Sequence, residues 1–209
     1  MSTTTKSAII ETMYARKSIR KYDPDFKISR EEISEMLTDA MTAPSSSNQQ
    51  PWRFLVITDD AVKKEIRSMS FNQEQLETSS AIIAVLGATD FYKNAKKINE
   101  LSVATGAMSP EIAVAQTAGS EKLYSGLPTE ILKNVASFDA GLVSMQLMLI
   151  AKDRGLDTVA MGGFDKQAFA EKFELPANEF PIILLAIGKG IGPDRGTERL
   201  SVADVTTFI

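Results

Sequence analysis

Residues 29–58 read SREEISEMLTDAMTAPSSSNQQPWRFLVIT, and in this order they predict a helix, a polar loop and a buried strand. Ser29 and Glu32 form the capping-box pattern that marks the start of a helix. The apolar residues of this helix fall on one face, namely Ile33, Met36, Leu37, Ala40 and Met41. Pro44 stops the helix, and the apolar run from Arg53 to Thr58 follows the loop as a strand.

The chain on either side of this stretch continues as alternating helices and apolar strands. Helices are expected over residues 6–15, from Asp59 or Asp60 through Ile66, from Thr129 to Arg154 with Gly155 as its stop, and from Asp165. Further strands are expected over residues 81–87, 158–161 and 182–187. Residues 81–87 are nearly all apolar, which predicts a strand covered on both faces. The pattern indicates one domain with a central sheet and helices around it.

Two segments fit this pattern less clearly. Residues 89–128 are rich in Gly, Ser, Pro and Ala and predict two or three short helices around an insertion. Residues 189–209 are polar and then mildly apolar, which is typical of a tail that needs a partner surface to pack on. The length of 209 residues, with 44% hydrophobic and 24% charged residues, is otherwise that of a single globular domain.

The chain contains no histidine and no cysteine. Their absence excludes Ser-His-Asp and Cys-His triads, zinc sites built on these residues, Cys-ligated iron–sulfur clusters and disulfides. A carboxylate site for Mg²⁺ or Ca²⁺ stays open. If the protein is an enzyme, its chemistry must come from carboxylates, lysines, hydroxyls or an organic cofactor.

Charge and hydropathy narrow the class of partner. The net charge is −4, which disfavours nucleic acid and anionic membranes as partners. Residues 1–30 carry seven Lys or Arg against three acids, a local charge of +4, so the remainder carries −8. This patch indicates either an anionic small ligand or a solvated face. No apolar run is long enough for a signal peptide or a membrane span, which predicts a cytoplasmic protein.

Two polar segments in the first quarter of the chain could bind a ligand. Arg16, Ser18 and Arg20 offer two guanidiniums and a hydroxyl that could converge on a phosphate, or could simply face solvent at a helix end. The loop from Pro44 to Trp52 is dense in amide and hydroxyl donors beside the only tryptophan. That density suits a planar heteroaromatic ligand, although an ordinary helix-to-strand loop has the same residue types.

Two features near the end of the chain could also bind a ligand. Met161-Gly162-Gly163-Phe164-Asp165 lies where a strand ends and a helix begins, so its glycines could let the backbone approach a flat ligand. A tight turn with Asp165 as helix cap explains the same residues, and no GxGxxG fingerprint is present. Arg199 is a late arginine that could join the first patch or lie on the surface.

Together, in this order and spacing, these features resemble the nitroreductase family of FMN-dependent oxidoreductases. The resemblance covers nearly the whole chain, from ARKSIRKYD (15–23) through APSSSNQQPWRF (43–54) to AMGGFD (160–165) and TERLSVADV (197–205). It implies an α+β fold with a mostly antiparallel central sheet flanked by helices. It also implies a homodimer in which the C-terminal tail extends onto the partner, with residues 89–128 shaping the substrate pocket.

The resemblance also implies the residues that bind FMN, and no catalytic side chain, because the flavin N5 carries the chemistry. Arg16, Ser18 and Arg20 match the segment that binds the phosphate and ribityl chain. Pro44, Ser45, Ser46 and Asn48 match the loop that reaches the flavin from the other subunit. The remaining matches are Asn72 and Gln75 at the flavin edge or ribityl, Gly162 and Gly163 beside N5, and Arg199 at the phosphate.

The activity implied is transfer of hydride from NADH or NADPH, through FMN, to nitroaromatics, quinones or similar acceptors in ping-pong order. No metal is implied. Two alternatives stay open. The same flavin-binding fold could run another reaction, such as flavin reduction or destruction, or dehalogenation. A non-catalytic flavin-binding protein is the other alternative. Within residues 89–128, Phe91, Tyr92 and Tyr124 are candidates for a lid over the substrate pocket.

Overall fold

A computed structural model of the chain describes residues 7–194 and 196–209, so Lys6 of the basic patch lies outside the described residues. The sheet has strand order β1-β2-β4-β3, and each neighbouring pair is antiparallel. Its strands are β1 (Trp52–Ile57), β2 (Ala81–Ala88), β3 (Asp157–Met161) and β4 (Glu179–Gly188). The expected α+β fold with a mostly antiparallel sheet is therefore confirmed.

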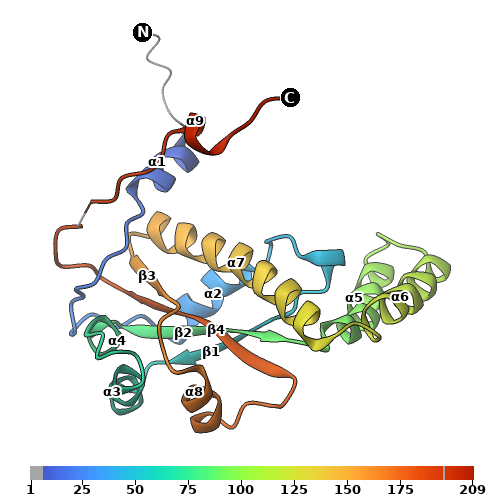
Figure 1. Ribbon diagram of the computed structural model, residues 1–209, viewed down its shortest axis with the longest axis horizontal. Helices are drawn as coiled ribbons and strands as arrows, with labels where there is room; N and C mark the ends of the chain where they lie inside the picture. Colours follow the sequence, from blue (N-terminus) through green and yellow to red (C-terminus); the bar gives the residue numbers. More distant parts are fainter. Residues whose placement is uncertain (1–6, 195) are drawn as a thin grey trace.

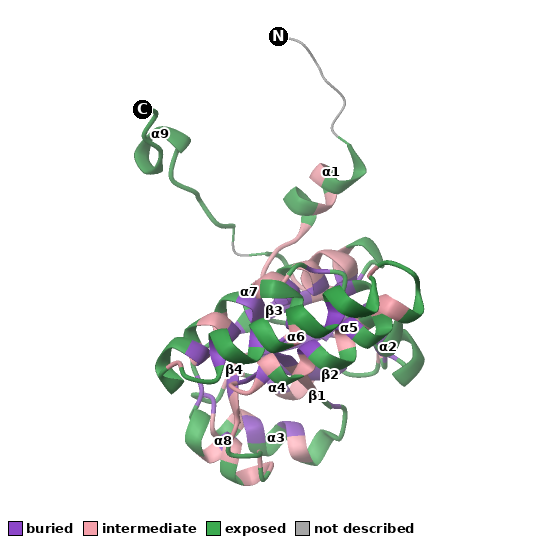
Figure 2. Cartoon of the chain, turned by 90° about the vertical axis from the view of Figure 1, so that its right-hand side faces the viewer, coloured by how far each residue is buried: buried purple, intermediate pink, exposed green. Residues whose placement is uncertain are grey.

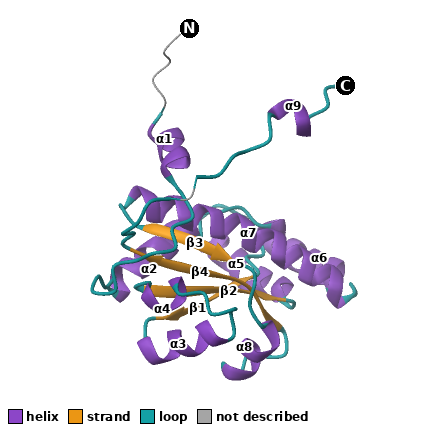
Figure 3. Cartoon of the chain, turned by 60° about the vertical axis from the view of Figure 1, so that its left-hand side comes forward, coloured by secondary structure: helices purple, strands orange, loops and turns teal. Residues whose placement is uncertain are grey.

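Helices lie on both faces of this sheet (Figures 1 and 3). They are α1 (Ala8–Ala15), α2 (Arg30–Ala40), α3 (Asp60–Ser68), α4 (Gln75–Thr78), α5 (Asn94–Ala104), α6 (Pro110–Tyr124), α7 (Thr129–Asp153), α8 (Lys166–Lys172) and α9 (Val202–Val205). Two 3₁₀ turns, η1 (Ser46–Asn48) and η2 (Phe91–Lys93), complete the described elements. The segment expected to hold short helices contains η2, α5 and the longer α6, which project from one end of the sheet (Figure 1).

Strand β2 alternates strictly between two cores and is buried along its whole length, as its apolar sequence predicts. Ala81, Ile83 and Val85 pack with α2 and α7 on one face. Ile82, Ala84 and Leu86 pack on the other face, where α3, α4 and α8 supply their own apolar side chains, Ile66, Leu76 and Phe169. Each face of the sheet is therefore closed by helices, and the loops at the strand ends remain open for a site.

Local signals fix most helix boundaries. The Ser29 hydroxyl accepts from the Glu32 N–H at 3.1 Å while the Glu32 carboxylate accepts from the Ser29 N–H at 2.9 Å, so the capping box is formed. Asp59, rather than Asp60, caps α3 by accepting from the Val62 N–H. Gly155 follows α7 with a φ of +76°, the left-handed conformation typical of a helix stop.

Strand β4 begins three residues earlier than its apolar pattern predicts. Pro181 lies inside it and pairs with Leu86 of β2. Strand β3 pairs only with residues 184–188 of β4, so Pro181 has a strand neighbour on one side alone. A proline has no N–H to donate and is tolerated at such an edge position. The expected start at Ile182 was wrong because proline in the sequence reads as a strand boundary.

Helix α7 matches its predicted length, and it buries only part of its apolar residues. Its buried residues are Leu132, Ala136, Asp139, Ala140, Val143, Ser144, Leu147 and Ala151. Ile131, Phe138 and Met145 are also apolar but are exposed. Among the described residues, α7 is the one helix long and apolar enough for a membrane span, with a mean hydropathy of 1.3. Core helices of globular proteins meet the same criterion, and α7 packs on the sheet.

Both ends of the described chain extend beyond the packed body (Figure 2). Helix α1 and helix α9 contain no buried residue. Ile9 and Tyr14 on α1 are exposed, as are Val202, Val205 and Phe208 in the tail. Val202, Val205 and Phe208 belong to the tail for which the sequence predicts a partner surface to pack on.

Candidate functional site

The segment Arg16–Tyr22 is extended rather than helical, because α1 ends at Ala15. The Ile19 N–H donates to the Thr158 carbonyl at 3.1 Å, and Ser18 forms a parallel bridge with Thr158 of β3. Ile19 is buried, so the alternation of the extended chain turns Ser18 and Arg20 away from the core. The sequence prediction of a helix end at this motif was therefore correct only for Arg16.

Ser18, Arg20 and Gln75 line one hollow with a volume of about 290 Å³. Its other lining residues are Lys21, Glu74, Pro193 and Asp194. Arg16 lies two residues before Ser18, and its Nε is buried with no hydrogen-bond partner among the described residues. A buried guanidinium nitrogen without a hydrogen-bond partner costs free energy, so the Nε of Arg16 is a candidate donor to a ligand.

The segment before β2 and the turn after β3 meet beside this hollow. The Gln73 side chain donates from Nε2 to the Gly163 carbonyl at 3.1 Å. Gln75 donates from its Nε2 to Gln73 Oε1 at 2.8 Å and is itself buried. A Cβ at Gly162 would meet no atom within 4 Å, which leaves that side of the turn open to a ligand. Asn72 is exposed on the same segment, with a φ of +55°.

The loop before β1 carries an unusual backbone. Ser47, Asn48 and Gln50 have φ values of +49°, +55° and +48°. Left-handed backbone costs a residue other than glycine about 1 kcal/mol or more, with asparagine the most tolerant of the three. Three such residues within four positions require a scaffold that holds them.

That scaffold comes partly from helices that follow far along the chain. Asp139 of α7 is fully buried, and its two carboxylate oxygens accept from the Ser46 N–H at 3.0 Å and the Ser46 hydroxyl at 3.1 Å. Burial raises the pKa of Asp139, and the hydrogen bonds from Ser46 offset part of this effect. The hydroxyls of Ser47 and Tyr124 lie 3.1 Å apart, which joins the loop to α6.

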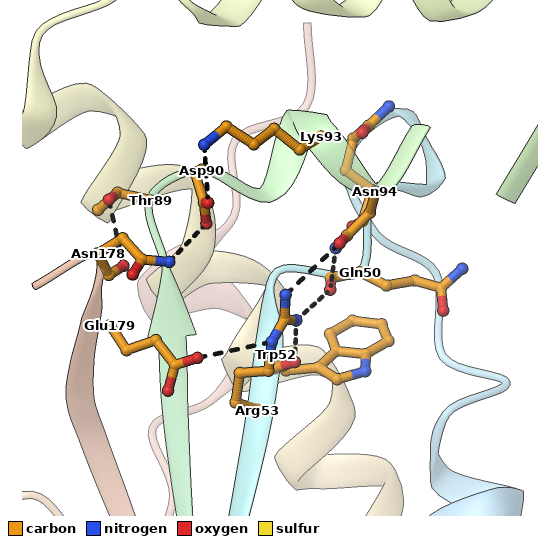
Figure 4. A network of polar contacts seen from close by, with 10 residues as sticks. Gln50, Trp52, Arg53, Thr89, Asp90, Lys93, Asn94, Asn178 and Glu179 are labelled. Atoms are coloured by element: carbon orange, nitrogen blue, oxygen red, sulfur yellow. Dashed lines mark hydrogen bonds and ion pairs between the residues drawn. The ribbon is translucent and has the colours of Figure 1, made fainter. Parts of the chain in front are cut away.

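A polar network holds the end of the same loop against η2 and α5 (Figure 4). Asn94 donates from Nδ2 to the carbonyls of Gln49 and Gln50, at 2.8 and 3.2 Å. Arg53 donates to the Trp52 carbonyl at 2.8 Å and lies 3.8 Å from the Glu179 carboxylate. The loop is thus attached to α5, α6 and α7, and its conformation depends on the helices that follow β2.

Asp90 ties the start of η2 to the start of β4 in the same network (Figure 4). It accepts from Asn178 Nδ2 at 2.7 Å and pairs with Lys93 at 3.2 Å. Burial raises the pKa of Asp90, but the hydrogen bonds from Asn178 and Lys93 outweigh it, so the pKa lies below its ordinary value. Asp90 is therefore a structural carboxylate that stays ionised.

The structure separates the sequence-predicted residues into two groups at opposite ends of the sheet. Ser18 forms a bridge with Thr158 of β3. Thr158 pairs with Ile187 of β4, and Ile187 pairs with Ala81 of β2. Trp52, which follows the other loop, pairs with Gly87 of β2. Six residues along a strand span about 20 Å. Within one chain, the strand end that follows Ser45, Ser46 and Asn48 is therefore about 20 Å from the strand end that Ser18 contacts.

Several predicted roles change in the structure. Arg199 is exposed in the tail and donates to the carbonyls of Thr197 and Glu198, so it joins neither group. Trp52, the residue that follows the predicted loop, is 4% exposed and packs in the core with α2. Phe91 is fully buried edge-to-face against Tyr124, with ring centroids 5.0 Å apart. Phe91 is thus a core residue and not part of a lid.

Asp139 and Asn94 are the functional candidates that the sequence did not reveal. Asp139 is one acid in an apolar helix, ASFDAGLV (136–143), and Asn94 stands at a helix start, where asparagine is ordinary. A lone carboxylate among residues that otherwise face a core is the signal that could have singled out Asp139. Nothing in the sequence indicates which segment it would contact.

A larger hollow lies elsewhere, with a volume of about 880 Å³. It is a groove between α1, α2 and α7, and its lining includes Ile9, Leu142, Met145 and Leu149. Pro44 also lines it, so the groove runs up to the loop before β1. An apolar groove of this size, next to an unpacked helix, has the character of a protein interface.

Comparisons with known proteins agree with the sequence resemblance. The family model described as "Nitroreductase family" matches residues 13–189. YdgI of Bacillus subtilis, named as an NAD(P)H nitroreductase, is 43% identical over 95% of this chain and 96% of its own. A CLA biosynthesis enone reductase of Lactiplantibacillus plantarum is 31% identical over 96% of this chain and 94% of its own.

A solved structure is similar over the whole chain. It is a nitroreductase of Exiguobacterium sibiricum in complex with FMN, 39% identical, with a TM-score of 0.92 and full coverage of both chains. That likeness extends to the parts of the chain that carry both groups of predicted residues.

Proposed function

Because this chain belongs to the nitroreductase family, we propose that it is an FMN-dependent oxidoreductase that uses NADH or NADPH. The observation that carries the proposal is the hollow where Ser18, Arg20 and Gln75 come together, in a chain 39% identical to a protein solved with FMN. When bound, FMN supplies the redox chemistry, since it takes hydride from NAD(P)H and passes the electrons to an acceptor in ping-pong order.

The residues present fit FMN. The buried Nε of Arg16 lacks an acceptor, and a phosphate offers several. Arg20 is exposed beside the hollow, where its positive charge would stabilise the phosphate, and Ser18 would add a directed hydrogen bond. Gln75, held by Gln73, would orient the cofactor. Gly162 leaves room for a flat ring, whereas a Cβ at Gly163 would contact the Phe71 ring, and both glycines could offer backbone N–H groups.

The second group of residues completes the site only if another subunit supplies it. The loop that carries Pro44, Ser45, Ser46 and Asn48 leads into Trp52, which lies about 20 Å along the sheet from the strand end that Ser18 contacts. The groove lined by α1 and α7 leads up to Pro44, so a second copy seated there would bring its own cofactor segment near this loop. We therefore propose a homodimer with two FMN sites, in the cytoplasm, in which the tail and Arg199 reach the partner.

The proposed acceptors are nitroaromatics, quinones or similar conjugated compounds. The names of two relatives, an NAD(P)H nitroreductase and an enone reductase, support a conjugated acceptor without selecting one. The helices α5 and α6 stand next to the loop before β1, so their side chains are placed to select the acceptor. No side chain acts as acid or base in this proposal, so protons come from solvent or from the flavin.

Purified protein tests the proposal directly. We expect a yellow protein whose flavin absorbance bleaches on addition of NADH or NADPH and recovers with a quinone or nitroaromatic. Bleaching without any acceptor-dependent turnover would indicate the non-catalytic flavin-binding alternative. Turnover limited to free flavin or to a halogenated compound would indicate the other flavoenzyme alternatives. A colourless protein that neither binds added FMN nor oxidises NAD(P)H would overturn the proposal.

A further inference from the structure

Asp139 is a charged side chain buried in the middle of α7, where most of its neighbours on the buried face are apolar. Burial of an ionised carboxylate disfavours folding unless hydrogen bonds compensate for the lost water. In this structure both compensating hydrogen bonds come from one residue, Ser46. The carboxylate therefore contacts nothing but the loop before β1 by hydrogen bond among the described residues.

The two hydrogen bonds fix different properties of Ser46. The bond from its N–H to Asp139 Oδ2 holds the backbone just before Ser47 and Asn48, the residues with left-handed φ. The bond from its hydroxyl to Asp139 Oδ1 fixes the direction of the hydroxyl hydrogen, because a carboxylate can only accept. With its hydrogen committed to Asp139, the Ser46 hydroxyl can only accept a hydrogen bond from a ligand, through the free lone pairs of Oγ.

We propose that Asp139 is a positioning residue for the cofactor. It holds the strained loop in its binding shape, and it orients the Ser46 hydroxyl so that this group accepts a hydrogen bond from a donor on FMN, such as the ring N–H or a ribityl hydroxyl. The inference rests on the proposed function, since it assumes that the loop contacts FMN across the dimer.

Two substitutions at Asp139 separate its two effects. Asp139→Ala removes both acceptors and should weaken FMN binding at least about tenfold, the loss expected for two charge-assisted hydrogen bonds. Asp139→Asn can still accept from the Ser46 N–H through Oδ1, but its Nδ2 must donate to the Ser46 hydroxyl. The Ser46 hydroxyl then presents a hydrogen-bond donor to FMN instead of an acceptor. This change should weaken FMN binding by about three- to tenfold.

The matched control is Ser144→Ala on the same helix. Ser144 is also buried, and its hydroxyl has no hydrogen-bond partner among the described residues. Its removal should leave FMN affinity within about twofold of the parent protein, as expected for a group that makes no hydrogen bond. A general response of α7 to loss of a buried polar group would instead affect the two positions alike.

The experiment measures the FMN dissociation constant by flavin fluorescence and the thermal midpoint of each apoprotein. A positioning role predicts that Asp139→Asn, which keeps both hydrogen bonds but removes the buried charge, binds FMN more weakly while its apoprotein midpoint stays the same or rises. A merely structural role predicts that the midpoint falls in step with FMN affinity, and that result would overturn the proposal. If Asp139→Ala does not fold, the Asp139→Asn variant decides.

A double substitution tests the path through Ser46. If Asp139→Asn acts only on the Ser46 hydroxyl, then Asp139→Asn with Ser46→Ala should bind FMN no more weakly than Ser46→Ala alone. Additive losses would overturn the proposed path. If the parent protein binds FMN and the Asp139 variants bind it equally well, this inference alone is wrong. If the parent protein does not bind FMN, the proposed function is wrong as well.

Discussion

Arg20 is exposed at the hollow that Ser18 and Gln75 also line, and its guanidinium donates to the Ser18 carbonyl at 3.3 Å. If it binds the FMN phosphate, Arg20→Ala removes a charged hydrogen bond and should weaken FMN binding by about 1.5–3 kcal/mol. Titration of apoprotein with FMN measures this loss. Arg30→Ala, an exposed arginine at the start of α2, is the control, and equal affinities for both variants would remove the phosphate role from Arg20.

Single residues show where the sequence was informative and where it was not. Arg16, Ser18 and Arg20 could be predicted as phosphate ligands because their side chains suit a phosphate in type and spacing. The left-handed backbone at Ser47 and Gln50 was not, because neither residue type indicates positive φ. Their conformation depends on Asp139 and Asn94, which follow at distances along the chain that no local pattern encodes.

At the scale of the element, the capping box of α2 offers a clean test. Ser29→Ala removes the hydroxyl that accepts from the Glu32 N–H and should lower the free energy of unfolding by about 1 kcal/mol. Urea unfolding measures the loss. Ser34→Ala is the control, since Ser34 is exposed in the same helix and its hydroxyl donates to the carbonyl four residues before it. A loss of equal size in both variants would show that the cap contributes nothing specific.

The same cap predicts a pH dependence. The Ser29 N–H, and then the Ser29 hydroxyl, lower the pKa of Glu32 below its ordinary 4.5. Stabilisation from ionised Glu32 is thus complete above pH 4.5 and is lost as the pH falls through the lower value of the folded state. In Ser29→Ala, NMR titration should find the Glu32 pKa closer to its ordinary value, and an unchanged pKa would contradict this account.

Helix α7 shows how far pattern alone reaches for an element. Its length and its stop at Gly155 were predictable, but its broad apolar surface could not be divided between a core and an intermolecular face. Hydrophobic periodicity reports that side chains avoid water and does not report what covers them. The four-residue helix α4 was missed for a different reason, since one helical turn has no period to detect.

The exposed face of α7 leads to a prediction about assembly. Met145 is 39% exposed and lines the groove between α1 and α7. Met145→Glu places a charge where the partner is proposed to pack, so light scattering should find a monomer with reduced FMN content. The control is Val56→Glu on β1, where the parent side chain is 36% exposed. A dimer that survives Met145→Glu would place the subunit contact elsewhere.

At the scale of the whole molecule, the C-terminal tail extends away from the packed part of the chain (Figure 2). Removal of residues 201–209 deletes Val202, Val205 and Phe208, which are exposed in the single chain. Circular dichroism should therefore report an intact fold, while sedimentation should find a weaker dimer, because those apolar groups lose their proposed partner surface. A truncated protein whose dimer is as stable as the parent would show that the tail does not bind the partner.

The separation of the two residue groups along the sheet has a genetic consequence. If each site takes its phosphate-binding half from one chain and its loop from the other, then Arg20→Ala and Asp139→Ala damage opposite halves. A mixed dimer of these two chains has one site with both defects and one site with none. Random pairing leaves about a quarter of all sites intact, so the two alleles expressed together should give sites with the FMN affinity of the parent protein, which neither allele gives alone.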